Sequence, residues 1–239
     1  MSGFNSFGGG AGGGAGGGGT PQAGLFANLP GTCVVGDSYY PDDAPGLWAK
    51  CFVTNTWSWF YCGYPVTLPP SSGWTAFSNA AIATAGVRTF RAVGGDFQGE
   101  VRAPALNTVV MGLAWGGVGV VGGTWKENAD AQLVMAGNYV HNGEWRSARY
   151  AAWNGGKTAD YFTDPCDSAP RMFWLKFLQP GAGNRVISIS FDGLNFDDIV
   201  TQAYDLTITP DRVGYIVSGA GSARVYGTLT LFHYAESTT

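Results

Sequence analysis

Four glutamates come closest to a catalytic set in this sequence: Glu100, Glu127, Glu144 and Glu236. Glycosidases use two carboxyl groups about 5–10 Å apart on one face of the fold. Glu127 and Glu144 lie near Trp125 and Trp145, and aromatic rings beside acids suit stacking on a sugar. No two glutamates lie two or four residues apart, the spacing that places side chains on one face of a strand. We therefore predict that the chain is not an enzyme. A polysaccharide-degrading enzyme that uses Glu127 and Glu144 is the alternative.

Two other patterns resemble catalytic motifs but lack the context that those motifs need. Residues 117–122 match the spacing G-x-G-x-x-G, yet no helix follows them, and a dinucleotide site requires that helix. His141 and His233 are the two histidines, and no G-x-S-x-G nucleophile motif accompanies them. We interpret both histidines as structural or surface residues, and we expect no cofactor.

The four cysteines do not have the spacing of a zinc site, because no C-x₂-C pair and no neighbouring histidine is present. Cys33, Cys51 and Cys62 lie close together in the sequence, and Cys166 lies far from them. A Cys33–Cys51 or a Cys51–Cys62 disulfide would join adjacent strands of a small sheet. Free and mostly buried thiols are the expected state for a protein made in a cytoplasm.

Aspartate residues cluster at two places in the sequence, and each cluster could be considered as a calcium site. The two clusters are Asp160, Asp164 and Asp167, and Asp192, Asp197 and Asp198. Calcium takes six to eight oxygen ligands, which this spacing alone does not supply. Asp192-Gly193 more simply predicts a hairpin turn. We therefore predict no metal site.

A polar segment rich in aromatic residues, between residues 138 and 162, is the better candidate for ligand binding. Flat rings with amide and guanidinium donors are the groups that bind saccharides and protein surfaces. We expect these rings to be exposed in loops. The alternative is that rings such as Tyr150 and Trp153 belong to the core. The predicted ligand-binding residues are Asn142, Trp145, Arg146, Arg149, Trp153 and Tyr161.

Short segments with two-residue alternation follow one another from about residue 74 to residue 234. Glycine, asparagine, aspartate and proline separate them, which is the pattern of an antiparallel sandwich. Three of the alternating series are Phe173, Leu175, Phe177; Ile187, Ile189, Phe191; and Val213, Tyr215, Val217. The predicted fold class is all-β, an antiparallel β-sandwich of the jelly-roll type, over residues 65–239.

The N-terminal part of the chain has a different character. Ten of the twelve residues 8–19 are glycine, so this stretch offers no side chains to bury and is costly to order. We predict a glycine-rich arm over residues 1–24, with Phe4 and Phe7 as an anchor that docks in a pocket. Residues 25–64 predict a small three-stranded β module, with strands at 32–35, 47–53 and 57–61.

Composition limits the possible partners. The net charge is −4 and the basic residues are scattered, so duplex nucleic acid is not an expected partner. No apolar run approaches the ~20 residues of a membrane span, so we expect no membrane insertion. No signal peptide is recognisable at the N-terminus, so the expected origin is a cytoplasm. Charged residues make up 13 % of the chain and aromatic residues 14 %, which fits an oligomer that hides apolar surface.

The C-terminal third has a recognisable order of motifs: W-L-K-F at 174–177, R-V-I-S-I-S-F-D-G-L-N-F at 185–196, T-P-D-R-V-G-Y-I-V at 209–217 and G-T-L-T-L-F-H-Y at 227–234. This order resembles the concanavalin-like (laminin-G-like) jelly rolls of bacteriophage virion proteins. Residues 29–60, beside the glycine-rich arm, resemble small aromatic β modules of phage fibres. Residues 126–170 match neither pattern.

The resemblance implies a virion surface protein, a tail fibre or adhesin that attaches the particle to a host surface by multivalent binding. The implied partners are other virion proteins, through the arm, and a host-surface glycan or protein. We expect a homotrimer, because closed symmetry multiplies weak contacts. The alternatives are a capsid decoration or cement protein and a polysaccharide-degrading tail spike.

Overall fold

The computed structural model describes most of the chain after the glycine-rich segment. The described residues are 19, 21–76, 82–84, 86–93, 98–118, 120–126, 133–139, 144–150, 157–165, 171–179, 184–203, 210–218 and 226–238. Three sheets account for these residues, and the only helical element among them is a short 3₁₀ helix, η1 (Phe26–Asn28). The predicted all-β class is confirmed.

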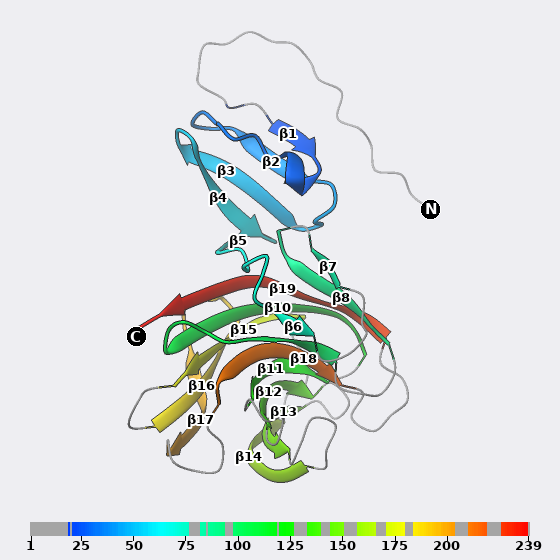
Figure 1. Cartoon of the computed structure of the whole chain (residues 1–239), viewed down its shortest axis with the longest axis vertical. Helices are drawn as coiled ribbons and strands as arrows, with labels where there is room; N and C mark the ends of the chain where they lie inside the picture. Colours follow the sequence, from blue (N-terminus) through cyan, green and yellow to red (C-terminus); the bar gives the residue numbers. More distant parts are fainter. Residues whose placement is uncertain are drawn as a thin grey trace.

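The body consists of two antiparallel sheets of seven described strands each, packed as the two layers of a jelly-roll sandwich (Figure 1). The first, here called the β10 sheet, has the order β17 (Asp197–Ala203), β16 (Asn184–Ser190), β15 (Met172–Leu178), β10 (Thr108–Val118), β19 (Tyr226–Ser237), β8 (Arg88–Val93) and β7 (Ile82–Thr84). The second, the β11 sheet, has the order β14 (Lys157–Pro165), β13 (Glu144–Tyr150), β12 (Leu133–Tyr139), β11 (Val120–Lys126), β18 (Arg212–Ser218), β9 (Gln98–Arg102) and β6 (Thr75–Ala76).

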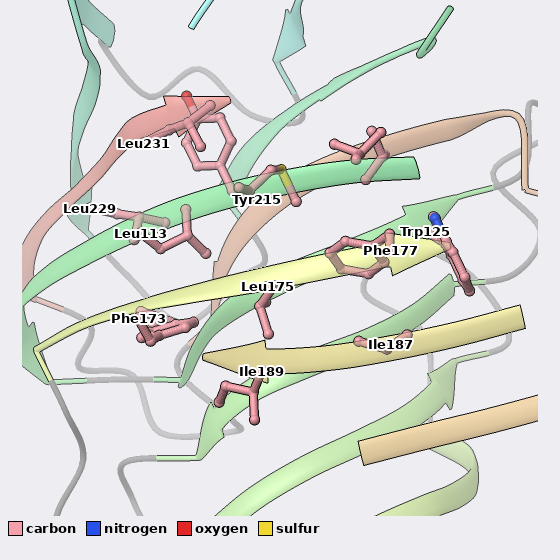
Figure 2. Close-up of a cluster of buried hydrophobic side chains, with 14 of the residues drawn as sticks. Leu113, Trp125, Phe173, Leu175, Phe177, Ile187, Ile189, Tyr215, Leu229 and Leu231 are labelled. Atoms are coloured by element: carbon pink, nitrogen blue, oxygen red, sulfur yellow. The ribbon is translucent and has the colours of Figure 1, made fainter. Parts of the chain in front are cut away.

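The main core fills the space between these two sheets. Figure 2 shows side chains from both sheets gathered there, among them Leu175 of β15 and Trp125 of β11. The predicted alternation is confirmed for the series Phe173, Leu175, Phe177 and for the series Val213, Tyr215, Val217, since all six side chains are fully buried. Phe191 departs from its series. It follows the end of β16 and is 52 % exposed.

The N-terminal module forms a separate small sheet with five strands, where the sequence predicted three. Its order is β1 (Pro21–Gly24), β2 (Ser38–Pro41), β3 (Leu47–Val53), β4 (Thr56–Tyr61) and β5 (Tyr64–Val66). Strands β3 and β4 lie where they were predicted. The predicted strand at 32–35 is wrong, because this segment leads into a turn in which the Asp37 N–H donates to the Val34 carbonyl at 3.0 Å. The sheet also begins at Pro21, inside the predicted arm, because β1 adds to β2 in a parallel pairing.

A disulfide joins Cys33, in the segment between β1 and β2, to Cys51 on β3. This is one of the two pairings that the spacing allowed, and the expectation of free thiols is wrong for these two residues. Cys62 has a free, exposed thiol. Cys166 lies outside the described residues. The small sheet is therefore held by a covalent link as well as by its strand pairing, as small β units with little core of their own often are.

A β-bulge in β19 lies where the small sheet docks on the β10 sheet. Gly112 of β10 pairs with His233 and Leu113 pairs with Leu231, so Phe232 is the extra residue. Leu231 and Tyr234 both face the main core, whereas Phe232 packs in a second cluster on the outer face of the β10 sheet. The bulge thus turns a fully buried aromatic ring away from the space between the large sheets.

The small sheet packs on this outer face mainly through aromatic rings. The Tyr61 ring stacks on Phe232 with ring centroids 4.5 Å apart and an interplanar angle of 2°. The Tyr64 ring meets Trp174 edge-on at 5.1 Å. Figure 1 shows the small sheet at one end of the molecule, beside β19 and β10, with the β11 sheet on the far side. Only the β10 sheet therefore has apolar packing on both of its faces among the described residues.

A buried ion pair links the two large sheets near one edge. The Arg88 guanidinium on β8 donates to both carboxylate oxygens of Glu100 on β9, at 2.6 and 2.7 Å. The Tyr215 hydroxyl on β18 donates to the same carboxylate. Burial, followed by the charge of Glu100, raises the pKa of Tyr215, which therefore stays protonated as a donor. This cluster satisfies its own charges inside the sandwich and has a structural role.

Candidate functional site

The structure corrects the prediction of an exposed Trp145. This residue lies on β13 rather than in a loop, and its side chain is 8 % exposed within the main core. Its ring meets Phe173 edge-on at 5.1 Å and Phe191 at 5.9 Å. The aromatic content of residues 138–162 therefore reflects core packing at this position, the alternative that the sequence left open.

The other predicted ligand-binding residues are only partly described. Arg146 and Arg149 lie on β13, and Tyr161 lies on the neighbouring strand β14. The Arg149 side chain is half-buried. Asn142 and Trp153 lie outside the described residues, as do Phe4 and Phe7 of the predicted anchor. The binding role of this strand pair stays a prediction.

The turn after β16 is the hairpin turn that Asp192-Gly193 predicted. The Asp192 carboxylate accepts hydrogen bonds from the backbone N–H groups of Leu194 and Asn195, both at 2.8 Å, and from the Ser190 hydroxyl at 2.9 Å. These donors, with the backbone contacts contributing most, hold the pKa of Asp192 well below its usual range. Its oxygens are thus occupied by the protein. Among the described residues, no group of three metal-ligating side chains lies together.

A cleft between the small sheet and the outer face of the β10 sheet has the features of a ligand site. Its volume is about 870 Å³. Ligand sites measure roughly 300–1,000 Å³ and occur preferentially where two structural units meet. Residues 43–45, which precede β3, and residues 61–62, at the end of β4, form one wall. The floor comes from β8, β10, β15 and β19, strands that are far apart in the sequence.

Three threonine hydroxyls line the floor of the cleft. Thr228 and Thr230 lie on β19, and Thr89 lies opposite Thr230 on β8. The Thr89 and Thr230 hydroxyl oxygens are 2.9 Å apart and share a hydrogen bond. Thr228 is exposed. Each hydroxyl can both donate and accept, so the row can pair with further hydroxyl groups.

Apolar groups alternate with these hydroxyls. Ala114 on β10 lies opposite Thr230 on one side and Met172 of β15 on the other. Gly116 lies opposite Thr228, and its exposed Cα leaves open space, since an added Cβ would meet no atom within 4 Å. The floor therefore combines a polar row with an adjacent smooth apolar strip.

Two charged residues of opposite sign, Arg171 and Asp43, stand among the lining residues, and both are exposed. The Arg171 carbonyl accepts the Trp115 backbone N–H at 2.7 Å, which fixes the backbone at that edge. The side chain of Trp115 itself belongs to the main core on the other face of β10, and its indole N–H is buried there.

The wall at residues 61–62 depends on a tight backbone. Cys62 has a positive φ of 48°, and its N–H donates to the Gly46 carbonyl at 2.9 Å. Gly46 has a φ of 87°, and an added Cβ would lie 3.2 Å from the Cys62 sulfur. Burial, followed by the charge of Cys62, raises the pKa of the Tyr61 hydroxyl. The wall therefore presents a neutral tyrosine beside the apolar strip.

The glutamates that the structure describes fully do not form a catalytic pair. Glu100 belongs to the ion pair with Arg88. Glu236 accepts from the Tyr234 hydroxyl at 2.7 Å and from the Ala105 backbone N–H at 2.6 Å. Glu127 lies outside the described residues, and only the backbone of Glu144 is described. The described part of residues 117–122 lies in β10 and β11, two strands rather than the strand and helix of a dinucleotide site.

Sequence reasoning missed the cleft for an identifiable reason. The alternation of Thr228 and Thr230 with Leu229 and Leu231 indicated a hydroxyl-bearing outer face on β19. Nothing in the sequence indicated that the small sheet would pack beside that face, because this contact joins segments about 170 residues apart, as in Tyr61 and Phe232. The hydroxyl alternation was the one signal available.

Comparisons with solved structures found chains of low sequence identity to this one. Similar chains include a carbohydrate-binding module from Bacillus subtilis, with 13 % identity, a TM-score of 0.48, and coverage of 70 % of this chain and 96 % of that one. Lectin II from Ulex europaeus has 11 % identity, a TM-score of 0.46, and coverage of 71 % and 94 %. A galectin from Caenorhabditis elegans has 12 % identity, a TM-score of 0.37, and coverage of 68 % and 99 %.

These likenesses concern the course of the backbone alone. No protein-family model and no curated protein matches the sequence. In the part of the chain that the structure describes, no helix is long and apolar enough to cross a membrane.

Proposed function

We propose that this protein is a surface attachment module that binds a glycan in the cleft between the small sheet and the β10 sheet. The observation that carries the proposal is the lining of that cleft, where a row of threonine hydroxyls runs beside an apolar strip. A pyranose ring has the matching arrangement, with hydroxyl groups around its edge and C–H groups on its faces. In the complex, the sugar hydroxyl groups can bind the threonine hydroxyls, and the sugar C–H face can pack on the apolar strip.

The charges of the lining favour a neutral sugar. Arg171 offers guanidinium donors and Asp43 offers a carboxylate acceptor, so the two charges compensate and both can bind hydroxyl groups. The ring of Tyr61 and the thioether of Met172 can pack on the C–H face. We therefore propose a hexopyranose unit of a larger glycan as the ligand.

We further propose that the carrier of this module is a bacteriophage virion and that the glycan belongs to the host surface. The support is the motif order in residues 174–234 and the aromatic module that follows the glycine-rich arm. Several copies on one particle would turn a weak single-site affinity into firm attachment. An image of particles labelled with an antibody against residues 184–203 tests this part, and particles without label would contradict it.

Filling the cleft is the sharpest test of the binding site. Gly116→Leu adds a side chain to open space, so the fold should tolerate it while the apolar strip becomes blocked. We expect binding to a panel of neutral hexopyranose oligosaccharides, measured by titration calorimetry, to weaken at least about tenfold, the equivalent of ~1.4 kcal/mol. Gly31→Leu is the matched control, because Gly31 also has open space around an added Cβ and lies outside the cleft.

A second pair of variants tests the hydroxyl row. Thr228→Val keeps the shape of the side chain and removes its hydroxyl, which we expect to weaken binding by a factor of about three to ten. Thr201→Val is the control, since Thr201 is exposed on β17 and does not line the cleft. Unchanged affinity in both Gly116→Leu and Thr228→Val would overturn the proposed site.

A further inference from the structure

The N-terminal module exposes an unusual number of large hydrophobic side chains. Of the nine large hydrophobic side chains that are exposed in the described residues, six belong to residues 25–53. On β3, Leu47, Ala49 and Cys51 are buried toward the docked side. Trp48 and Phe52 alternate with them and therefore lie on the opposite face. That second face has no described partner in this chain.

Four rings form a continuous aromatic ladder on this face: Tyr40 of β2, Trp48 and Phe52 of β3, and Phe60 of β4. Trp48 and Phe60 lie directly opposite each other, with centroids 4.5 Å apart and an interplanar angle of 19°. Tyr40 stacks on Trp48 at 6.1 Å, and Phe52 meets Phe60 edge-on at 6.0 Å. Tyr40 is 47 % exposed and Phe52 is 53 % exposed. The two end rings of the ladder, Tyr40 and Phe52, are therefore accessible to a partner.

A groove continues the ladder at the β4–β5 edge of the small sheet. Its volume is about 520 Å³, and Phe52, Ser58, Phe60, Pro65, Val66 and Leu68 are among its lining residues. No charged side chain lines the groove. Lys50 on β3 has its ammonium group 5.6 Å from the centre of the Phe52 ring. The expected occupant is therefore an uncharged, apolar peptide with aromatic side chains.

We propose that the ladder and its groove bind the Phe4–Phe7 segment of a second copy of this chain. Residues 1–20 contain no charged side chain, and Phe4 and Phe7 are the two aromatic residues among them. In a polyproline-II backbone, residues three apart lie on the same side and about 9 Å apart. This distance matches the span of about 9.6 Å from Tyr40 on β2 to Phe60 on β4, two strand spacings. The two phenylalanines can therefore contact the rings on these two strands.

The length of the glycine-rich tract is sufficient to reach a neighbouring copy. Residues 8–20 can span about 43 Å when extended, whereas the ladder lies within about 15 Å of β1, three strand spacings away. The tract is thus much longer than docking within one chain requires. Exchange of these segments between copies would cover the apolar face and link the copies into the kind of oligomer expected from the composition.

The oligomeric state tests this inference. We expect the full chain to form oligomers in size-exclusion chromatography with light scattering, and the double variants Phe4→Ser/Phe7→Ser and Tyr40→Ser/Phe52→Ser to be monomers. Phe191→Ser/Leu194→Ser is the matched control, because these two side chains are also exposed and apolar but lie on the β16–β17 turn. It should stay oligomeric. A monomeric full chain, or oligomers that persist in both test variants, would overturn the inference.

A cross-linking experiment distinguishes exchange between copies from docking within one chain. Two variants in a Cys62→Ser background, one with Phe7→Cys and one with Tyr40→Cys, are mixed and oxidised. Exchange predicts a covalent dimer of the two variants, above the background of the Cys62→Ser parent. A Phe7→Cys/Tyr40→Cys double variant that closes only within single chains would contradict exchange. The monomeric variants should still bind the glycan, because the groove beside the ladder and the cleft have no lining residue in common.

Discussion

The two faces of the β10 sheet meet different partners and hold them in different ways. The inner face packs against the β11 sheet through side chains from at least five of its strands, many of them aliphatic. The outer face holds the small sheet through a few aromatic contacts, such as Tyr61 on Phe232 and Tyr64 on Trp174. The inner contact is therefore distributed over many side chains, whereas the outer contact is concentrated in a few rings. The first should govern global stability, and the second should govern whether the cleft exists.

The largest expected effect comes from a matched pair of truncations, Phe173→Ala and Phe232→Ala. Both phenylalanines are fully buried, Phe173 on the inner face and Phe232 on the outer face. We expect Phe173→Ala to lower the free energy of unfolding by about 3–5 kcal/mol, because it leaves a cavity in the main core. Denaturant unfolding followed by tryptophan fluorescence measures this change.

Phe232→Ala should instead release the small sheet before the sandwich unfolds. We expect proteolysis within residues 67–73, between the two units, to become at least about tenfold faster at equal protease concentration, with the sandwich core still protected. Equal losses of global stability and equal protease sensitivity in the two variants would remove the distinction between the faces.

The next effect concerns the buried charges between the large sheets. Glu100→Gln leaves the Arg88 guanidinium, whose side chain is 10 % exposed, without its counter-charge. We expect the free energy of unfolding to fall by about 3 kcal/mol, because a buried charge that loses its partner is costly. Asp197→Asn is the control, since this carboxylate is exposed on β17. An equally small change in both variants would show that the ion pair adds little to the sandwich.

His233 gives the outer face a pH dependence. Its Nδ1 accepts the Thr67 backbone N–H at 3.1 Å, and burial lowers its pKa from 6.5 to about 4. The unfolded chain therefore binds a proton in a pH range where the native protein does not. Stability from this group is fully present above pH 6.5 and is lost as the pH falls toward 4, by at most about 3 kcal/mol.

The comparison variant is His233→Asn, whose side-chain oxygen can accept the same hydrogen bond without titrating in this range. Unfolding free energies measured between pH 7 and pH 4 should show a shallower slope in this variant than in the unaltered protein. Identical slopes would mean that His233 does not couple protonation to the docking of residues 67–70.

The smallest effect is expected at the turn that borders the outer face. Asp192→Ala removes the acceptor for the Leu194 and Asn195 N–H groups. We expect faster hydrogen exchange at these two amides and little change in the midpoint of thermal unfolding, because the turn is exposed. Gly193 lies under the Trp174 ring, so exchange at this turn also reports on the outer face. Unchanged exchange would show that the carboxylate does not hold the turn.

Local patterns predicted much of the inner face. Alternation in 173–177 and 213–217 assigned side chains to the core, because a strand sends every second residue to the same side. The same reasoning failed for Trp145, since a ring in a polar stretch has no local signal that separates an exposed position from a buried one. The glycan cleft was not predictable, because its walls come from segments that the sequence separates widely.

By itself, the sequence determined the all-β class, the inward series of the sandwich and the hairpin turn at Asp192, since each depends on neighbouring residues and on the two-residue period of a strand. Three features were decided only by the tertiary structure: the choice between the two disulfide pairings, the burial of Trp145 and the docking of the small sheet on Phe232. The physical reason lies in the bulge at Phe232, which breaks the period at one position and turns a core-like ring outward. Contacts between distant segments then stabilise that arrangement, and no local pattern records them.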